Sequence, residues 1–442
     1  MRKSIQLHSG LRVLSVAFDV GKDLLTWETH PNDQRLTGSL ANTTDAIVKV
    51  LKQLERLAKE NRYDEVRIIC ESTGVYHRAL LQLAAQRGMR TALAAGEAVA
   101  KMRTIESNDP NKSDEKDPGT ILAVAKIGKL LWHRLLDDQF AELRELHGVY
   151  KAAEEEHARC KTELHHMLKA IIPDLRLTKH ALFGPGGLRM LRLFGGNPIW
   201  IVACGSFESF VSKMKAEKLR VQTATLRKIW EAAESSVKLA VSPLVLSAQS
   251  TRVGHLYSDL DCWATRLELL AMDMVRCYRR IQEQNNTLPL RTPGILTELM
   301  AARLIAETGP LTDFSSFRQL LKYAGLNLCE RKSGAWRGKT KISRRGRANL
   351  RHVLNLWSLS LVSPGRLYAT YYRRKRDTEK MPGTKAMVCV MRKSLKMLYG
   401  WSRSGQEFDQ DRVQSNRTSA RTLPHLTATI ETPATSKHQV AS

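Results

Sequence analysis

The first residues that suggest chemistry are four acids in the first quarter of a very basic chain. Two of them end apolar runs, at residues 13–18 and 66–70, and the other two lie three positions apart: Asp19, Glu71, Asp114 and Asp117. Each alone also suits an ordinary strand-end or capping carboxylate. Two like charges about 4 Å apart repel by roughly 4 kcal/mol at an effective dielectric constant near 20, so four converging carboxylates need a cation. Mg²⁺ prefers carboxylate oxygens and water, and paired ions of this kind cleave phosphodiesters.

The spacing of Asp114 and Asp117 leaves two arrangements open. Residues three apart share one face of a helix. However, Pro118 follows Asp117 and disfavours helical backbone at that position. In the second arrangement Asp117 is the N-cap of a helix with Pro118 at its first position, and Asp114 lies in the preceding turn.

A second candidate is the basic segment 331–351, which holds nine Lys or Arg and no acid. Its glycines allow close approach to a phosphate, and Trp336 is able to stack on a base. A solvated basic loop is the alternative, but unopposed cations repel one another without a polyanion. We therefore expect nucleic-acid contact by Arg331, Lys332, Trp336, Arg337, Lys339, Lys341, Arg344, Arg345, Arg347 and Arg351. Ser333 lies in the same segment without a sequence neighbour that suggests a hydrolase triad.

Composition narrows the class of protein. The chain has 442 residues, with 70 Lys+Arg against 44 Asp+Glu, and its formal net charge is +26. This excess predicts a polyanionic partner, nucleic acid first. No apolar stretch reaches the roughly 18–20 residues that span a bilayer, so we expect no membrane partner. Seven scattered cysteines without a CxxC pair indicate neither a zinc site nor a disulfide framework, and favour a cytoplasmic location. Patterns typical of metalloproteases, P-loop ATPases and dehydrogenases are absent from the sequence.

The sequence around the acids predicts an α/β arrangement of strands and helices. Residues 12–19, 24–27, 66–70 and 89–95 look like strands. Helices are expected from about Thr43 to Leu57 and over 76–87, and together these predict a mixed sheet flanked by helices.

From about residue 137 the pattern becomes helical. Apolar residues at three- and four-residue steps predict long helices up to 171, before Pro173, and over 256–284. An antiparallel pair within the chain or an intermolecular coiled coil satisfies both patterns. Residues 180–250 look like a helical insertion. The expected domains are 1–135, a coiled-coil middle 136–287, an all-α domain 288–402 and a disordered tail 403–442. The turn at Pro293-Gly294-Ile295 suggests a phosphate-binding helix start.

These pieces together resemble the DEDD-type transposases of bacterial insertion sequences, the recombinases linked to guidance by a bridge RNA. The N-terminal resemblance rests on residues 18–22, 70–74 and 111–117. The C-terminal one rests on residues 292–295, 323–326, 333–334 and 342–351, with Phe314. Two positions depart from the family pattern: Pro118-Gly119 follows the last acid where Ala is usual, and residues 327–332 differ before Ser333.

The resemblance implies an N-terminal domain of the RNase H or RuvC type and a C-terminal transposase domain with a helix-hairpin-helix-like start. It implies that Asp19, Glu71, Asp114 and Asp117 hold Mg²⁺ and that Ser333 is the nucleophile that joins to DNA. It further implies a structured guide RNA, a homo-oligomer (dimer or tetramer) built through the long helices, and association with the nucleoid. Two alternatives stay open: a RuvC-like endonuclease that does not need Ser333, and an inactive nucleic-acid-binding relative.

Overall fold

The computed structural model describes residues 11–71, 74–107, 117–215, 221–239, 241–330, 332–333, 336–338 and 340–404; for 332–333 and 336–337 it describes the backbone. The chain divides into two compact units, Met1–Leu135 and Leu136–Ser442. Among the described helices none is long and apolar enough to cross a bilayer.

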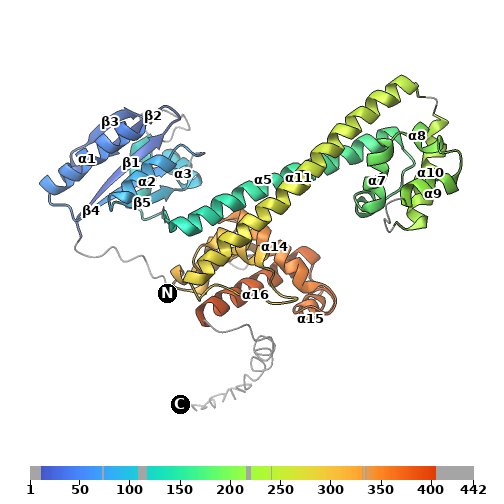
Figure 1. The fold of residues 1–442 in the computed structure, drawn as a ribbon. Helices are drawn as coiled ribbons and strands as arrows, with labels where there is room; N and C mark the ends of the chain where they lie inside the picture. Colours follow the sequence, from blue (N-terminus) through green and yellow to red (C-terminus); the bar gives the residue numbers. More distant parts are fainter. Residues whose placement is uncertain are drawn as a thin grey trace, which may run out of the picture. The chain divides into compact units, whose positions relative to one another are not determined.

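The first unit is built on a six-stranded mixed sheet with the strand order β3-β2-β1-β4-β5-β6 (Figure 1). Strands β1, β2 and β3 form an antiparallel meander, β4 and β5 run parallel to β1, and β6 is antiparallel to β5. The strands are β1 (Val13–Val20), β2 (Leu24–Thr29), β3 (Leu36–Ala41), β4 (Glu65–Glu71), β5 (Arg90–Ala94) and β6 (Leu130–Trp132). The predicted mixed α/β region is confirmed, and β3 and β6 are additions to it.

Helices cover both faces of this sheet. On one face α1 (Thr44–Glu60) and α2 (Arg78–Gln86) bury a core that includes Leu14, Ile47 and Leu80. Thr43 caps α1, because its hydroxyl accepts a hydrogen bond from the amide of Ala46. On the other face α3 (Gly96–Ser107) and α4 (Asp117–Lys126) bury a smaller core. A 3₁₀ turn, η1 (Pro31–Asp33), joins β2 to β3.

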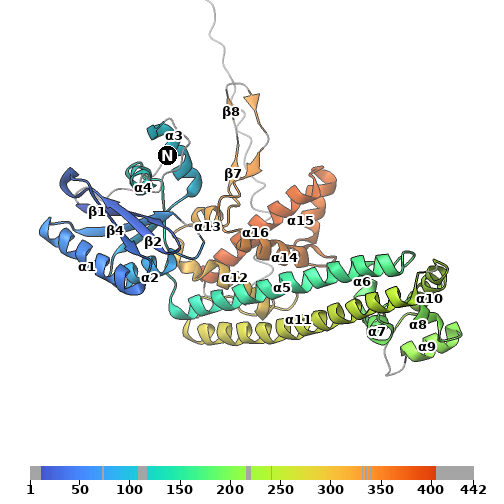
Figure 2. The same ribbon diagram turned by 90° about the horizontal axis from the view of Figure 1, so that it is seen from above.

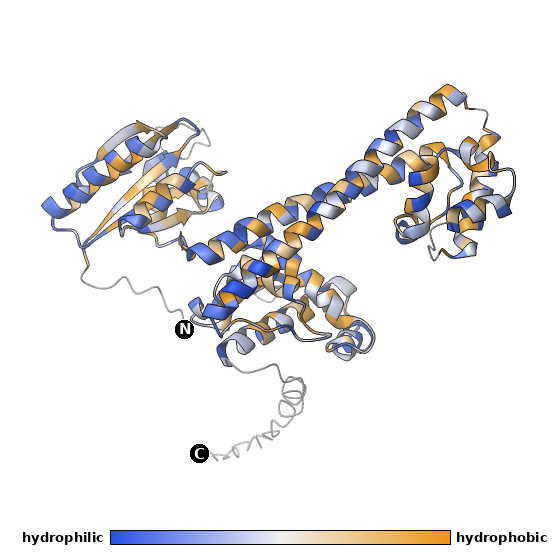
Figure 3. Cartoon of the chain, viewed as in Figure 1, coloured by the Kyte–Doolittle hydropathy of each residue, from blue (hydrophilic) through white to orange (hydrophobic). Residues whose placement is uncertain are grey.

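Two long antiparallel helices, α5 (Asp138–Ile171) and α11 (Pro243–Gln284), form the arm of the second unit (Figures 1 and 2). Arg280 pairs with Glu142 near one end, and Arg252 Nη2 lies 2.8 Å from Glu163 Oε1 further along. Of the two arrangements left open, the chain thus has the intramolecular pair. Hydrophobic and hydrophilic residues alternate along both helices, as their spacing predicts (Figure 3).

Helix α11 begins at Pro243, earlier than the predicted start at 256. Its additional turns bury Leu246 and Val253 against the insertion between the two long helices. This insertion has its own apolar core, which includes Phe210 and Trp230. Its helices are α6 (Lys179–Leu182), α7 (Pro185–Phe194), α8 (Pro198–Val202), α9 (Phe207–Lys215) and α10 (Thr223–Val237). The prediction of a helical insertion is therefore confirmed.

The remaining helices pack against the paired ends of α5 and α11. They share one apolar core with them, in which the buried Trp357 donates a 2.7 Å hydrogen bond to the carbonyl of Ile295. They are α12 (Glu298–Thr308), η3 (Leu311–Asp313), α13 (Phe317–Tyr323), α14 (Ala348–Val362), α15 (Ala369–Arg373), the π-helix η4 (Arg374–Thr378) and α16 (Gly383–Ser404). The expected domain boundary at residue 288 falls inside this unit, and residues 405–442 of the expected tail lie outside the described residues.

The expectation of an all-α C-terminal domain is wrong in one respect. Two short antiparallel ribbons lie between α13 and α14: β7 (Leu328–Cys329) pairs with β10 (Lys341–Ile342), and β8 (Lys332–Ser333) pairs with β9 (Trp336–Arg337). Strands of two residues are too short to show an alternating apolar pattern, and the basic residues and glycines of this segment are typical of a loop. The ribbons could therefore not be predicted from the sequence.

Candidate active site

Asp19 and Glu71 lie at the same end of two adjacent parallel strands. The register of β1 and β4 pairs Phe18 with Cys70, so the two acids come one residue later on each strand. Neighbouring strands are about 4.8 Å apart. Two residues earlier, Ala17 and Ile69 are buried in the core beneath α4. Because alternate residues share a face, both acids belong to the face that α3 and α4 cover.

Asp117 reaches the same face from the first turn of α4. Ile121 and Val124, four and seven residues later, are buried in the core of that face, so Asp117 lies on the inner side of the helix. The residue is 3 % exposed. Helix α4 begins at Asp117 with Pro118 next, so the proline stands at a helix start, where the missing amide is tolerated.

Arg103 supplies the charge that balances the buried Asp117. From α3, its Nε and Nη2 lie 2.8 and 2.7 Å from Asp117 Oδ1. A buried carboxylate without such a partner would be costly. Sequence analysis did not single out Arg103, since the 14-residue separation along the chain gives no local signal.

Glu71 lies against the start of α3. A Cβ atom added at Gly96 would be 2.5 Å from Glu71 Oε1, so any side chain at this position would require the glutamate carboxylate to move. The helix dipole and the first-turn amides of α3 favour a negative charge there. A larger residue at position 96 would displace the Glu71 carboxylate from the carboxyl end of β4.

Glu28 is a further acid on this face that the sequence analysis missed. It pairs with Ala17 across β1 and β2 and is 4 % exposed. Burial alone would raise its pKa, but hydrogen bonds and charges from Arg35 (2.9 Å) and His30 (2.8 Å) lower the pKa below the usual value. A Cβ added at Gly119 would be 3.3 Å from Glu28 Oε1, so Glu28 lies under the first turn of α4. The glycine after Pro118 fits this contact.

The fourth predicted acid, Asp114, lies outside the described residues, which omit 108–116. Among the residues that the structure does describe, no group of three or more His, Cys, Asp or Glu is placed to hold a metal ion. The donor chemistry nevertheless suits a hard divalent cation, because Asp19 and Glu71 offer carboxylate oxygens at one edge. The predicted tetrad and its Mg²⁺ remain predictions.

Ser333 lies on the ribbon β8–β9, opposite Trp336. With β7–β10 this forms one long hairpin that projects from the helical core in Figure 2. Arg331 and Lys339 lie outside the described residues, and Lys332, Trp336 and Arg337 are described by their backbone. Lys341, Arg344 and Arg345 are exposed at the end of the hairpin near the core.

Two backbone segments meet closely at the base of this hairpin. The amide of Arg344 donates to the carbonyl of Gly325 (3.1 Å), and the amide of Arg347 donates to the carbonyl of Tyr323 (2.8 Å). A Cβ at Gly346 would lie 2.5 Å from backbone atoms of Gly325 and Tyr323. Gly325 and Gly346 have φ angles of 65° and 155°, which favour glycine. The close contact between these two segments thus explains why glycine is needed in the motifs at 323–326 and 342–346.

Two of the basic residues assigned to nucleic-acid contact have partners inside the protein. Arg351 Nη1 donates to the carbonyls of Ala324 (3.1 Å) and Gly346 (3.0 Å). Arg347 Nε lies 2.5 Å from Glu307 Oε2, and burial, which would lower the pKa of Arg347, is outweighed by the charge of Glu307, which raises it. Contact of Arg347 and Arg351 with nucleic acid remains a prediction, beside a clear structural role.

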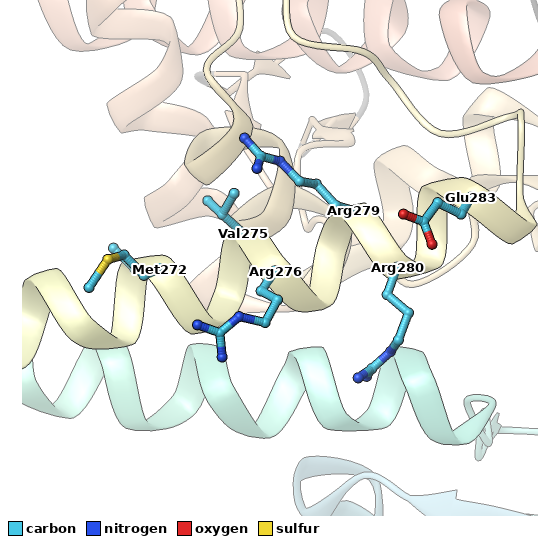
Figure 4. Close-up of a pocket in the computed structure, with 7 residues that line it drawn as sticks. Met272, Val275, Arg276, Arg279, Arg280 and Glu283 are labelled. Atoms are coloured by element: carbon cyan, nitrogen blue, oxygen red, sulfur yellow. The ribbon is translucent and has the colours of Figure 1, made fainter.

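A shallow depression elsewhere runs along α11 and includes Met272, Arg276, Arg279 and Arg280 (Figure 4). Each guanidinium has a carboxylate partner: Asp273, Glu298 and Glu142 respectively. Since its cations are already neutralised, this depression is not a strong anion site.

Comparison with known protein families gives two matches. A model for DEDD transposases of IS110 elements, described as a transposase, matches residues 16–173, which include all four predicted acids. A model described as the transposase IS116/IS110/IS902 family matches residues 290–373, which include the hairpin with Ser333. No curated protein matches the chain.

Proposed function

Because the chain belongs to the IS110 family of transposases, we propose that it cuts and rejoins DNA with two groups of residues, one in each compact unit. The first group is Asp19, Glu71, Asp114 and Asp117. The second is Ser333 with the basic residues of its hairpin. The observation that carries this proposal is that Asp19 and Glu71 lie at the carboxyl ends of the adjacent strands β1 and β4, with Asp117 on the same face of the sheet.

The acids would hold a divalent cation, with Mg²⁺ the candidate that best suits carboxylate ligands. When bound, such a cation polarises a phosphate oxygen and offsets developing negative charge. Arg103 pairs with Asp117 and orients it from α3, and Gly96 leaves space for the carboxylate of Glu71. These contacts support a role of Asp117 and Glu71 as preorganised oxygen ligands.

Ser333 would act as the nucleophile. Its hydroxyl oxygen forms a bond to phosphorus and loses its proton, and one backbone P–O bond of the DNA breaks to leave a hydroxyl on the released strand. The reverse of this step rejoins strands. Exposed Lys341, Arg344 and Arg345, at the inner end of the same hairpin, support phosphate binding along the hairpin that carries the serine.

The proposal also includes two partners. A structured guide RNA is implied by the resemblance and agrees with the net charge of +26. A dimer or tetramer would let the acids of one subunit work with the serine of another.

The test uses the full chain expressed in cells beside a plasmid that carries its own element with the flanking DNA. Asp19→Asn, Glu71→Gln and Ser333→Ala should each abolish excision and rejoining. Lys341→Gln should weaken the reaction without abolishing it. Arg62→Gln, an exposed cation on the turn after α1, serves as the matched control and should leave excision unchanged.

Each variant separates one alternative from the proposal. Persistent rejoining by Ser333→Ala would exclude the serine mechanism. Cleavage without rejoining in the same variant would instead indicate a RuvC-like endonuclease. If the wild-type chain binds DNA but supports no strand cleavage, the reading as an inactive relative is correct.

A further inference from the structure

A second basic surface lies at the C-terminal side of the helical core, apart from the hairpin. Residues 373–385 carry six Lys or Arg and two acids, and all of them except residue 373 fall beyond the match to the transposase family. They cover the end of α15, the π-helix η4 and the start of α16. In Figure 2 this region is well separated from the hairpin that carries Ser333.

Most of this positive charge has no internal counter-charge. Glu379 pairs with Lys375 (2.6 Å) and Arg374 (3.5 Å) and so neutralises part of the segment. The four remaining cations are exposed, and none has a carboxylate within ion-pair distance among the described residues: Arg373, Arg376, Lys380 and Lys385. We call these four residues the C-terminal basic surface.

The backbone beneath these cations is held in a defined shape. The amide of Glu379 donates to the carbonyl of Arg374, and the amide of Met381 to the carbonyl of Lys375, both at 3.0 Å. Such π-helical turns are frequent at functional sites. Fixing several like charges on a short rigid segment costs free energy through repulsion, and a bound polyanion removes that cost.

The aromatic residues nearby distinguish between kinds of polyanion. Proteins that hold unpaired bases offer exposed rings for stacking. Here the half-buried ring of Tyr371 is already covered by Arg374, Lys375 and Lys393, whose charged groups lie 5.4, 5.7 and 4.7 Å from its centre. Tyr368 is buried. The surface therefore offers charges for phosphates, while the rings of Tyr368 and Tyr371 are already engaged within the protein.

We propose that the C-terminal basic surface binds the phosphate backbone of duplex DNA without reading its sequence. The proposal rests on the proposed function in taking DNA as the partner. It adds a second point of contact, distinct from the hairpin, that would hold the DNA while the hairpin acts on one phosphodiester.

The test compares the full-length wild type with a variant in which Arg373, Arg376, Lys380 and Lys385 are replaced by Gln. Binding to a labelled duplex of arbitrary sequence is measured by fluorescence anisotropy over a range of salt concentrations. We expect the variant to bind at least about tenfold more weakly, with a log–log salt slope shallower by about 0.9 for each lost phosphate contact. Its thermal unfolding should match the wild type, since all four side chains are exposed.

A matched control removes the same charge elsewhere in the second unit. Replacement by Gln of four exposed cations on the helical insertion should leave both the affinity and the slope near the wild-type values: Arg192, Lys213, Lys228 and Lys238. An equal loss in the control and in the test variant would overturn the proposal, because it would reflect net charge alone.

Three further outcomes would also decide the matter. An unchanged salt slope in the test variant overturns the inference and leaves the proposed function standing. A larger loss for single-stranded DNA or for a hairpin RNA than for the duplex overturns the choice of ligand. Failure of the wild type to bind any duplex overturns both proposals.

Discussion

At the scale of single residues, the protein keeps a negative charge at Glu28 beneath the first turn of α4. The folded structure lowers the pKa of this carboxyl below its usual value of 4.5. A group of this kind contributes stability at pH values above its unfolded pKa, and the contribution disappears as the pH falls through the folded pKa. The stabilising effect of Glu28 should therefore be present near neutrality and be lost in acid.

We predict that Glu28→Gln lowers the unfolding temperature of the first unit at pH 6 and that this difference from the wild type shrinks toward pH 3. Unfolding followed by hydrogen exchange of α4 over this pH range checks the prediction. Glu97→Gln is a suitable control, since the pair of Glu97 with Lys101 on α3 is exposed. A pH-independent difference would mean that shape, and not charge, explains the effect.

The residues around the acids show what sequence can and cannot predict. Asp19 and Glu71 stand out because each ends an apolar run, which is a local signal. Glu28 and Arg103 give no local signal, because the role of Glu28 depends on the register of β1 with β2 and that of Arg103 on the packing of α3 against α4. Interactions across elements are set by tertiary structure, so composition and spacing do not reveal them.

At the scale of elements, the base of the hairpin depends on two glycines. Gly346→Ala would bring a Cβ within 2.5 Å of the backbone of residues 323 and 325 at a φ of 155°. We predict a loss of about 2 kcal/mol or more in local stability. Hydrogen exchange of the amides of Arg344 and Arg347, which pair across this contact, reports it directly.

The matched control is Gly254→Ala in the middle of α11. A Cβ at Gly254 meets no atom within 4 Å, and alanine favours helix. This variant should therefore gain about 0.5–1 kcal/mol. Equal effects of the two substitutions would contradict the explanation by close backbone approach.

A buried charge cluster joins three helices next to the hairpin. Glu307 on α12 is 2 % exposed and accepts from Arg347, at the start of α14, and contacts His147 Nδ1 on α5 at 2.9 Å. Burial would raise the pKa of Glu307, but the hydrogen bond to His147 and the charge of Arg347 lower it. Breaking a buried pair costs about 3–5 kcal/mol, because the remaining charge lacks a partner.

We accordingly predict that Glu307→Ala destabilises the second unit by several kcal/mol and frees the hairpin base. Urea unfolding together with exchange of the amide of Arg347 measures both effects. Glu298 lies on the same helix as Glu307 and forms a solvent-exposed pair with Arg279 of α11. Glu298→Ala should cost less than about 1 kcal/mol. Similar losses for the two variants would argue against a special role of the buried cluster.

The elements themselves were predictable to different extents. Strands β1, β4 and β5 and the helices α1, α2 and α5 follow clear apolar periodicity. Strand β3 does not, because residues 36–41 are mostly exposed and owe their conformation to pairing with β2. The early start of α11 depends on burial of Leu246 against the insertion, a contact that exists only in the folded chain.

At the scale of the whole molecule, the predicted acids and the predicted nucleophile belong to different compact units of one chain. If a working site combines acids and serine from different subunits, two inactive variants should rescue each other. We predict that co-expression of Asp19→Asn with Ser333→Ala restores excision to a measurable fraction of the wild-type level. The double variant Asp19→Asn/Ser333→Ala, co-expressed with either single variant, is the control and should stay inactive; absence of rescue by the two single variants would favour acids and serine from the same subunit.

The arm of paired helices also bears on how such a chain changes over evolutionary time. Helices α5 and α11 run antiparallel along the whole arm. Residues that face each other across the pair, such as Glu163 and Arg252, therefore lie at the same distance along it. Adding the same number of helical turns to α5 and α11 would lengthen the arm, and removing them would shorten it. In both cases the core near α12 would keep its contacts. Residues 174–289, which neither family match covers, include the whole returning helix α11 and the helices of the insertion. A change of arm length that preserves the pairing therefore has to alter α5, which lies within the first family match, together with α11, which lies outside both.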